Sequence, residues 1–346
     1  MADFGGWLMP IEYPSAGVLA EHAAVRERVG LFDVSHLGKA SVKGVGALEF
    51  LNSLLTNELE RATDGKAQYT LLCTEAGGVV DDLIVYRNSA DDFFLVPNAA
   101  NTTAVVAALS AAAPKGIKIE NLHSDYAVLA LQGPRASDVL AKLDVKQQLE
   151  YMAFTNVKIA DCSVILCRTG YTGEFGFEII PLTNDAPKVW DALVSAMVEF
   201  GGVICGLGAR DTLRTEMGYP LHGHELTLDI SPVQASASWA IGWKKAEFRG
   251  ASALREEREQ KNTPRLQALL AQDRGIPRAG MKVLSLAGDE IGIVTSGTFS
   301  PSLKCGIALA LIKPELEEGT SVDIEVRGRK SRAAITALPF LPSHVR

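Results

Sequence analysis

The pattern of the chain changes near residue 265, and this change limits most strongly what the chain can fold into. Before it, expected helices such as 187–200 alternate with strands and hairpins, which favours α+β over a doubly wound sheet. After it, short apolar strands are broken by Gly and Pro, which predicts a small β-barrel or jelly roll. The charged stretch 253–264 ends in a turn signal and is the clearest domain boundary in the sequence.

The bulk composition excludes several classes of function. With 346 residues, of which 47% are hydrophobic, the chain is long enough for two or three domains. A formal charge of −7 argues against a general nucleic-acid binder, which needs a basic stripe to neutralise phosphates. Five cysteines without a CxxC favour neither a disulfide framework nor a zinc ribbon. No apolar run nears the roughly 20 residues that span a bilayer, and the chain begins without a basic and apolar leader, so we expect a cytoplasmic protein.

Two carboxylates interrupt the apolar strand predicted over 79–86. Because successive strand residues point to opposite faces, Asp82 shares a face with Tyr86 and Asp81 lies on the other. At about 3.3 Å per residue, Asp82 and Tyr86 are roughly 13 Å apart, the length of a small heteroaromatic ligand. We therefore predict a ligand site along this face, with Asp82 as its functional carboxylate. For Asp81 a turn cap or an exposed side chain is a sufficient interpretation.

A glycine-rich loop over 169–178 leads into another apolar strand, which contains Glu178. Glycines allow the backbone to approach a ligand closely. An unpaired carboxylate in an apolar strand is costly, and a ring with two adjacent N–H donors, such as an aminopyrimidine or a pterin edge, would satisfy Glu178 bidentately. A hairpin in which the carboxylate is bound internally is the alternative, and the sequence leaves both open.

The stretch 206–208 looks at first like a dinucleotide fingerprint. It lacks the third glycine and a βαβ unit, so we interpret it as a loop that opens a helix over 210–216. On that helix Arg210 can hold a carboxylate or a phosphate, or it can simply pair with Asp211 or Glu216. Both interpretations of Arg210 stay open.

The pair His222 and His224 invites a metal site. Two residues that are two positions apart, with no third ligand nearby, make a poor site, so we expect a polar loop and no metal. No Ser-His-Asp pattern, P-loop or HExxH stands out either.

Several motifs in order resemble those of the aminomethyltransferase (T-protein) family of the glycine cleavage system, and the resemblance covers nearly the whole chain. The motifs are 4–10, 32–38, 77–86, 131–134, 169–178, 206–211 and 295–301. The resemblance implies a three-domain cloverleaf around tetrahydrofolate, with two antiparallel-sheet α+β domains and a C-terminal β-barrel. It assigns 1–40 and 141–252 to a first, folate-binding domain, 41–140 to a second domain that carries the catalytic Asp, and 265–346 to the barrel.

The same resemblance implies roles for individual residues. Asp82 matches the catalytic aspartate, and Glu178 matches the carboxylate that recognises the pterin ring. The other cofactor-binding positions are Arg210, Tyr86, Asn98, Tyr69, Tyr171, Leu37 and Arg346. Leu37 stands where relatives often carry Met, a volume-conserving change.

The implied reaction takes an aminomethyl group from the lipoyl arm of the carrier (H-) protein, releases ammonia and leaves 5,10-methylenetetrahydrofolate. Because an amine leaves and a weakly basic nitrogen attacks, one ionised carboxylate suffices. We expect Asp82, which has no evident histidine partner in the sequence, to position the folate and stabilise positive charge on the transferred carbon rather than to act as a strong base.

Two further interpretations follow from the resemblance. Folate-binding, non-enzymatic assembly factors for iron–sulfur enzymes share the loop 169–178 but carry a cysteine where this chain has Gly170. Carrier proteins of the glycine cleavage system are commonly acidic, so Lys244, Lys245 and Arg249 are a candidate docking cluster, with a solvated surface patch as the alternative.

Overall fold

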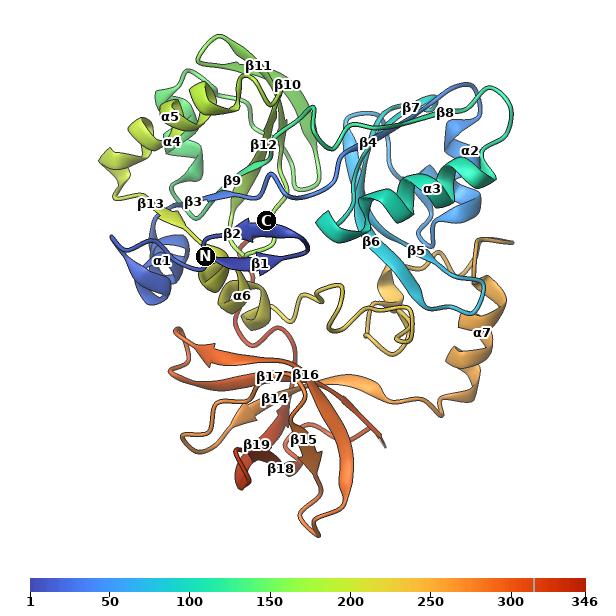
Figure 1. Cartoon of the computed structure of the whole chain (residues 1–346), viewed down its shortest axis with the longest axis vertical. Helices are drawn as coiled ribbons and strands as arrows, with labels where there is room; N and C mark the ends of the chain where they lie inside the picture. Colours follow the sequence, from blue (N-terminus) through green and yellow to red (C-terminus); the bar gives the residue numbers. More distant parts are fainter. Residues whose placement is uncertain (314) are drawn as a thin grey trace.

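The computed structural model describes residues 1–313 and 315–346, and it has three units around a common centre (Figure 1). Two units are built on open sheets of six and five strands, and the third is a closed barrel. We call them the first sheet unit, the second sheet unit and the barrel. The α+β architecture with a C-terminal barrel, expected from the sequence, is confirmed.

The first sheet unit has the strand order β10-β11-β12-β9-β3-β13. Neighbours are antiparallel except β13 and β3, which run parallel. Its strands are β3 (Gly30–Asp33), β9 (Leu129–Gln132), β10 (Phe154–Ile159), β11 (Cys162–Cys167), β12 (Gly176–Pro181) and β13 (Val203–Cys205). Its helices are α1 (Gly17–Glu27), α4 (Ala136–Lys142), α5 (Ala186–Met197) and α6 (Leu207–Glu216), with the short 3-10 helix η3 (Val198–Phe200). Helices α4 and α5 cover one face, where Val139 and Leu193 bury Phe177 of β12.

The second sheet unit is antiparallel throughout, in the order β5-β6-β7-β4-β8. Its strands are β4 (Ala40–Lys43), β5 (Lys66–Cys73), β6 (Val79–Ser89), β7 (Asp92–Val96) and β8 (Lys118–Asn121). Its helices are α2 (Ala47–Leu54), α3 (Thr102–Ala112) and α7 (Ala251–Gln260), with the short 3-10 helices η1 (Leu59–Arg61) and η2 (Ala99–Asn101). Along β6, Leu83 and Val85 pack with residues of α2 and α3, whereas Ile84 and Tyr86 pack toward the first sheet unit. The predicted alternation of faces on this strand is therefore confirmed.

Two of the expected domain boundaries are wrong. The range 41–140 includes β9 and α4, but β9 pairs with β3 and β12 and α4 packs on that same sheet. The range 141–252 includes Leu226, which is buried against Leu71 of β5 in the second sheet unit. In each case the chain comes back to a unit that it had already left. Local sequence pattern could not reveal this, because pairing and packing between distant segments bring the chain back. We propose domain boundaries that follow sheet membership.

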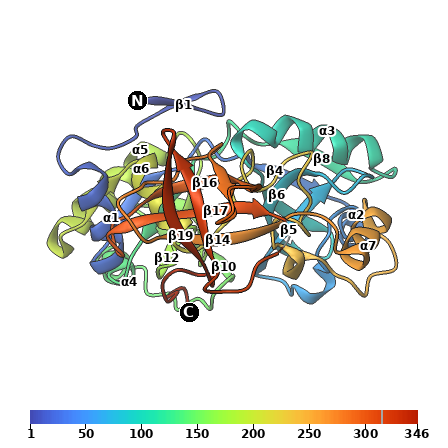
Figure 2. The ribbon, with the colours of Figure 1, turned by 90° about the horizontal axis from the view of Figure 1, so that it is seen from below.

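The barrel closes in the order β14-β17-β16-β15-β18-β19. Its strands are β14 (Arg265–Ala271), β15 (Lys282–Leu284), β16 (Glu290–Ser300), β17 (Cys305–Ile312), β18 (Ser321–Val326) and β19 (Arg329–Thr336). Leu269, Val294 and Ile324 are among the apolar side chains of its core. Seen from below, the barrel lies in front of both sheet units (Figure 2). The charged stretch before it, expected as a boundary, is largely the helix α7.

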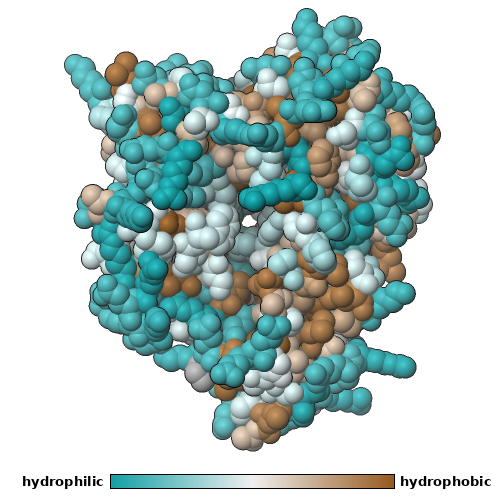
Figure 3. Space-filling model, turned by 180° about the vertical axis from the view of Figure 1, so that it is seen from behind, coloured by the Kyte–Doolittle hydropathy of each residue, from teal (hydrophilic) through white to brown (hydrophobic). Residues whose placement is uncertain are grey.

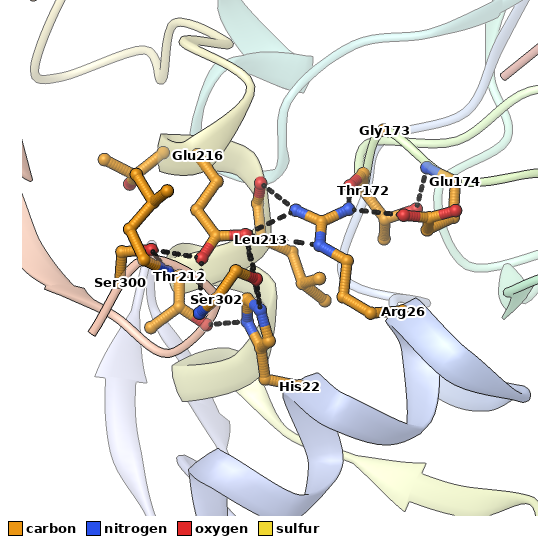
Figure 4. A network of polar contacts seen from close by, with 12 residues as sticks. His22, Arg26, Thr172, Gly173, Glu174, Thr212, Leu213, Glu216, Ser300 and Ser302 are labelled. Atoms are coloured by element: carbon orange, nitrogen blue, oxygen red, sulfur yellow. Dashed lines mark hydrogen bonds and ion pairs between the residues drawn. The ribbon is translucent and has the colours of Figure 1, made fainter. Parts of the chain in front are cut away.

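A buried polar network joins α1, α6 and the turn after β16 (Figure 4). The Glu216 carboxylate accepts hydrogen bonds from Ser300 Oγ at 2.5 Å and from Arg26 Nη2 at 2.7 Å. Arg26 also donates to Glu174 Oε1 at 3.0 Å, and His22 Nε2 lies 3.3 Å from Glu216 Oε2. Burial raises the pKa of Glu216, but the hydrogen bonds and positive charges of these neighbours outweigh it and hold the pKa at about 2.

The two ends of the chain complete the centre. The N-terminal hairpin, β1 (Ala2–Phe4) and β2 (Trp7–Met9), overlaps the C-terminus in Figure 1, but Figure 2 shows the two at opposite sides of the molecule. The C-terminal tail returns from the barrel to the first sheet unit, where Arg168 Nη2 donates to the Val345 carbonyl at 2.7 Å. The His344 backbone N–H donates to the Gly173 carbonyl at 2.7 Å. Within the described part of the chain, no helix has the length and apolar character needed to cross a membrane.

Candidate active site

A cavity of about 720 Å³ lies at the centre, where the two sheet units, the N-terminal hairpin and the C-terminal tail meet. The back face of the molecule is hollowed near its middle (Figure 3). This volume is within the usual range for sites that bind cofactor-sized ligands. The cavity brings together eight of the nine predicted site residues, namely Asp82, Glu178, Arg210, Asn98, Tyr69, Tyr171, Leu37 and Arg346.

Asp82 reaches the cavity from β6 and is held there by two donors. The Tyr69 hydroxyl donates to Asp82 Oδ2 at 3.0 Å, and the Asn98 side-chain amide donates to Asp82 Oδ1 at 2.9 Å. Tyr69 faces Ile84 across the β5–β6 ladder, so it is a diagonal neighbour of Asp82 on the same face. Asn98 follows β7 and extends the register in which Val96 faces Ile84. Both strand neighbours of Asp82 therefore orient its carboxylate.

Asp81, expected at a turn or in solvent, is fully buried instead. Its carboxylate accepts hydrogen bonds from the Asn98 backbone N–H at 2.9 Å and from the Asn101 side-chain amide at 2.7 Å. Asn101 lies at the N-cap of α3, and its side-chain amide binds Asp81 rather than the helix. The Asn98 amide nitrogen also lies 2.9 Å from Asp81 Oδ1. Asp81 thus fixes the segment that carries Asn98 and supports Asp82 from behind.

Burial is the largest influence on the pKa values of the two aspartates. Burial and the Asp82 carboxylate raise the pKa of Asp81. Burial also raises the pKa of Asp82, while the hydrogen bond from Tyr69, the charge of His222 and the hydrogen bond from Asn98 oppose that rise. The sequence suggested no histidine near Asp82, and the structure corrects this. His222 lines the cavity, and its Nε2 donates to the Val79 carbonyl at 3.1 Å.

Glu178 reaches the cavity from the opposite side, on β12. Its neighbour Phe177 packs under α4 and α5, so strand alternation directs Glu178 toward the second sheet unit. The Thr169 hydroxyl donates to Glu178 Oε2 at 2.5 Å, and the Tyr86 hydroxyl lies 3.5 Å from the same oxygen. Among the described residues, these contacts all use Oε2 and leave Oε1 without a protein donor. Internal binding is therefore confirmed for one oxygen of Glu178, whereas recognition of a ligand by the other oxygen stays a prediction.

Tyr86 is the one predicted site residue that does not line the cavity. Its side chain is 1% exposed and packs edge-on against Phe154 at a centroid distance of 5.3 Å. Its hydroxyl lies 3.2 Å from Thr169 Oγ1. Tyr86 shares a face with Asp82, as predicted, but the first sheet unit covers its end of the strand. It therefore supports Glu178 from behind rather than contacting a ligand.

Gly170 lies next to Gln132, and the fit leaves no room for a side chain. A Cβ atom at Gly170 would be 2.1 Å from Gln132 Oε1. Gln132 is held in place, because its amide nitrogen donates to the Thr169 and Phe177 carbonyls at 3.2 Å each. Its Oε1 accepts a hydrogen bond from the Thr172 hydroxyl at 2.8 Å. A cysteine at position 170 would therefore require Gln132 to move.

Arg210 is a cation without a carboxylate partner in the described part of the chain. The two partners that the sequence suggested are taken: Asp211 pairs with Arg214 at 2.7 Å, and Glu216 pairs with Arg26 at 2.7 Å. The Arg210 guanidinium stacks on the Tyr171 ring, 4.7 Å from its centroid. Burial lowers the pKa of Arg210. A desolvated guanidinium that lines the cavity is suited to bind an anionic group of a ligand.

Several cavity residues were missed or set aside at the level of sequence. His36 lies in the motif 32–38 and lines the cavity next to Leu37, and its Nδ1 is buried without a partner among the described residues. Burial, with Arg210 and Lys39 nearby, lowers the pKa of His36 to about 3, so its ring is neutral. Trp239 lines the cavity and stacks on Tyr69 at a centroid distance of 5.1 Å. His36 could have been predicted as a site residue because it belongs to the motif 32–38. No motif or periodic pattern near Trp239 indicated that it would line the cavity.

The candidate docking cluster does not form a free basic surface. Lys245 Nζ donates to the Leu55 and Asn57 carbonyls at 2.6 Å and 2.9 Å, and burial lowers its pKa to about 8. Arg249 Nε lies 3.6 Å from Glu75 Oε1. Lys245 thus binds backbone of the second sheet unit, Arg249 makes an ion pair at the surface, and of the cluster only Lys244 is classed as exposed.

The loop histidines also have structural contacts in addition to lining the cavity. His224 Nδ1 donates to the Thr295 carbonyl at 2.9 Å and so ties the loop to the barrel. No group of three or more potential metal ligands is found in residues 1–313 and 315–346.

Comparisons with known proteins agree along the whole chain. Two family models match it: "GCVT N-terminal domain" over residues 1–245 and "Glycine cleavage T-protein C-terminal barrel domain" over residues 265–341. The chain is 55% identical to an aminomethyltransferase of Parafrankia sp. over 345 residues, which covers 100% of this chain and 94% of the relative. It is 55% identical to the Mycobacterium tuberculosis (strain H37Rv) aminomethyltransferase, covering 98% and 92% of the two chains. The crystal structure of the glycine cleavage system aminomethyltransferase T from Bartonella henselae superposes with a TM-score of 0.92 at 36% identity, over 99% of this chain and 94% of that one.

Proposed function

Because the chain belongs to the aminomethyltransferase (T-protein) family of the glycine cleavage system and is an aminomethyltransferase of that system, we propose that tetrahydrofolate binds in the central cavity. The carbon to be transferred comes from the lipoyl arm of the carrier (H-) protein, and ammonia is released. One observation carries the proposal: two carboxylates, Glu178 on β12 and Asp82 on β6, reach the same cavity from two different sheets. The localisation expected from the sequence stays a prediction.

The residues of the cavity fit a folate. Glu178 Oε1 is the carboxylate oxygen left for the N–H donors of a pterin edge, because Oε2 is used by Thr169. Arg210 is desolvated and has no carboxylate partner among the described residues, which suits an anionic part of the same ligand. The Tyr171 ring, on which Arg210 stacks, also lines the cavity. Leu37 and Arg346 line the cavity as well and are proposed as further folate contacts.

We assign Asp82 to electrostatic stabilisation of the transferred carbon. Bound tetrahydrofolate supplies the nitrogen that accepts the one-carbon unit. The donors Tyr69 and Asn98 both favour the ionised form of Asp82 and fix its orientation. A fixed negative charge in a desolvated cavity stabilises positive charge that develops on the carbon as ammonia leaves. Because its two oxygens already accept hydrogen bonds, Asp82 is poorly suited to act as a strong base.

The assembly-factor interpretation receives less support from the same residues. That class carries a cysteine at the position of Gly170, and here Gln132 Oε1 lies 2.1 Å from where the Cβ would be. Its thiol therefore has no counterpart in this cavity.

Calorimetric titration with tetrahydrofolate tests the proposal. We expect one site per chain in the native protein and loss of measurable binding in Glu178→Ala. The exposed Glu259→Ala is the matched control and should bind as the native chain does. Absence of folate binding by the native chain would overturn the proposal.

Assay of ammonia release from the aminomethylated carrier protein then tests the reaction itself. A native chain that binds folate but releases no ammonia would contradict the assignment of this cavity to catalysis.

A further inference from the structure

A second cavity, of about 390 Å³, lies between α7, β14 and the segment 233–238, outside the site described above. We call it the cationic cavity. Its lining includes Arg258 and Lys261 at the end of α7, Arg265 at the start of β14, and Lys313 after β17. Hydroxyls of Ser236 and Thr263 also line it, and Glu315 is its one carboxylate. Charge in this cavity is therefore strongly positive.

Three of the cations of the cavity have no ion-pair partner among the residues that the structure describes. Over residues 1–313 and 315–346, neither Arg258, Lys261 nor Arg265 forms an ion pair. Two polar atoms of residues that line the cavity, Arg265 Nη1 and Thr263 Oγ1, are buried and have no hydrogen-bond partner among those residues. A buried guanidinium N–H without an acceptor is costly, so the wall of this cavity is short of acceptor oxygens.

We propose that the cationic cavity binds an oxyanion that carries two or more negative charges. Guanidinium groups match carboxylate and phosphate oxygens through parallel N–H donors, and lysine ammonium groups add charge at no fixed angle. Arg258 keeps its place by stacking on the Trp243 ring, 4.3 Å from the centroid. A multiply charged ligand engages more of these cations at once than a singly charged one, so we expect the site to favour multiply charged ligands.

Two sources of such an anion fit the position of the cavity. Ser238 lines the cationic cavity and Trp239 lines the central cavity, so both cavities reach the short 3-10 helix η4 (Ser238–Ala240). One source is a run of γ-glutamyl carboxylates extending from a folate in the central cavity, which rests on the proposed function. The other is a free polyphosphate or polycarboxylate, which does not. The chemistry at the cationic cavity is the same for both.

The test of the site is calorimetric titration with inorganic pyrophosphate. We expect saturable binding of one equivalent by the native chain, and binding at least about tenfold weaker in Arg258→Gln/Lys261→Gln. The control Lys115→Gln/Lys146→Gln removes the same charge from exposed positions elsewhere and should bind as the native chain does. Absence of saturable binding, or equal weakening in both double variants, would overturn the proposal. Thermal unfolding of each variant checks the fold, and Lys261→Gln alone serves if the stacked Arg258 proves necessary for stability.

A second arm distinguishes the two sources. Monoglutamyl and tetraglutamyl tetrahydrofolate are titrated with and without saturating pyrophosphate. If pyrophosphate reduces the affinity of the tetraglutamyl form to that of the monoglutamyl form, the folate tail occupies the cationic cavity. If it changes neither affinity, the cavity serves a free anion; either result supports the site. Pyrophosphate binding without any folate binding would contradict only the proposed function. Folate binding without pyrophosphate binding would contradict only the proposed anion site in the cationic cavity.

Discussion

Tyr69 donates its phenol hydroxyl to Asp82 Oδ2 over 3.0 Å. The contact depends on strand register, because Tyr69 faces Ile84 and therefore lies diagonal to Asp82 on the cavity face. Trp239 stacks on the Tyr69 ring and keeps the phenol in place. Burial raises the pKa of the Asp82 carboxyl, and this hydrogen bond is the largest opposing effect. A residue on the neighbouring strand thus opposes the effect of burial on the charge state of Asp82.

Asp82→Asn should lower turnover far more than folate affinity. The substitution keeps the shape of the side chain and removes the charge that we assign to stabilising the transferred carbon. We expect kcat to fall by about 100-fold or more, while the Kd for tetrahydrofolate changes by only a few fold. Steady-state kinetics with aminomethylated carrier and calorimetry with folate check the two quantities, with Asp229→Asn on the surface as the control. Equal losses in both would contradict the assigned role.

Tyr69→Phe should shift the acid limb of the pH–rate profile to higher pH. Loss of the phenol donor leaves burial less opposed, so the pKa of Asp82 rises further. Because the ionised carboxylate is the active form, more alkaline conditions are then needed to populate it. The pH dependence of kcat in the native chain and in the variant measures the shift. A profile that keeps its position while the rate falls would assign Tyr69 to ligand packing instead.

Gly170→Ala should destabilise the protein by about 1–3 kcal/mol, because the new Cβ must displace Gln132. Urea unfolding measures the change in the free energy of unfolding. The double variant Gly170→Ala/Gln132→Ala removes the clashing amide. Its loss of stability should therefore be smaller than the sum of the losses in Gly170→Ala and Gln132→Ala. Strict additivity in this cycle would mean that Gly170 and Gln132 do not constrain each other.

The Glu216 network should make stability depend on acid pH. Its pKa of about 2 lies below the ordinary 4.5 of a glutamate, so the stabilisation is present above about pH 4.5 and is lost as the pH falls toward 2. The loss corresponds to on the order of 3 kcal/mol. Glu216→Gln should flatten this dependence and lower stability at neutral pH, because Arg26 loses a buried partner.

Urea unfolding at a series of pH values measures the dependence. The exposed Glu259→Gln serves as the control and should keep the slope of the native chain. An unchanged slope in Glu216→Gln would show that other carboxylates govern acid stability.

Much of the candidate site was predictable because strand alternation is local. The apolar pattern of β6 directed Asp82 to one face, and that of β12 made the cost of burying Glu178 visible. Tyr86 shows the limit of the same argument. It shares the face of Asp82, but whether that face is open or covered depends on the first sheet unit, whose Phe154 packs on the Tyr86 ring. Periodicity predicts which face a side chain points to, and it carries no information on what lies there.

By itself, the sequence determined the three-unit architecture, the strands that carry the two carboxylates and, through its motifs, the family. Only the tertiary structure decided that Arg210 stays without a carboxylate partner among the described residues, while Asp211 and Glu216 pair elsewhere. It also decided that Arg346, at the end of the chain, lines the same cavity as Phe4 near its start. The physical reason is that a strand or helix pattern arises from neighbours a few positions apart. The partner of a buried charge is chosen instead by packing between segments far apart in the chain.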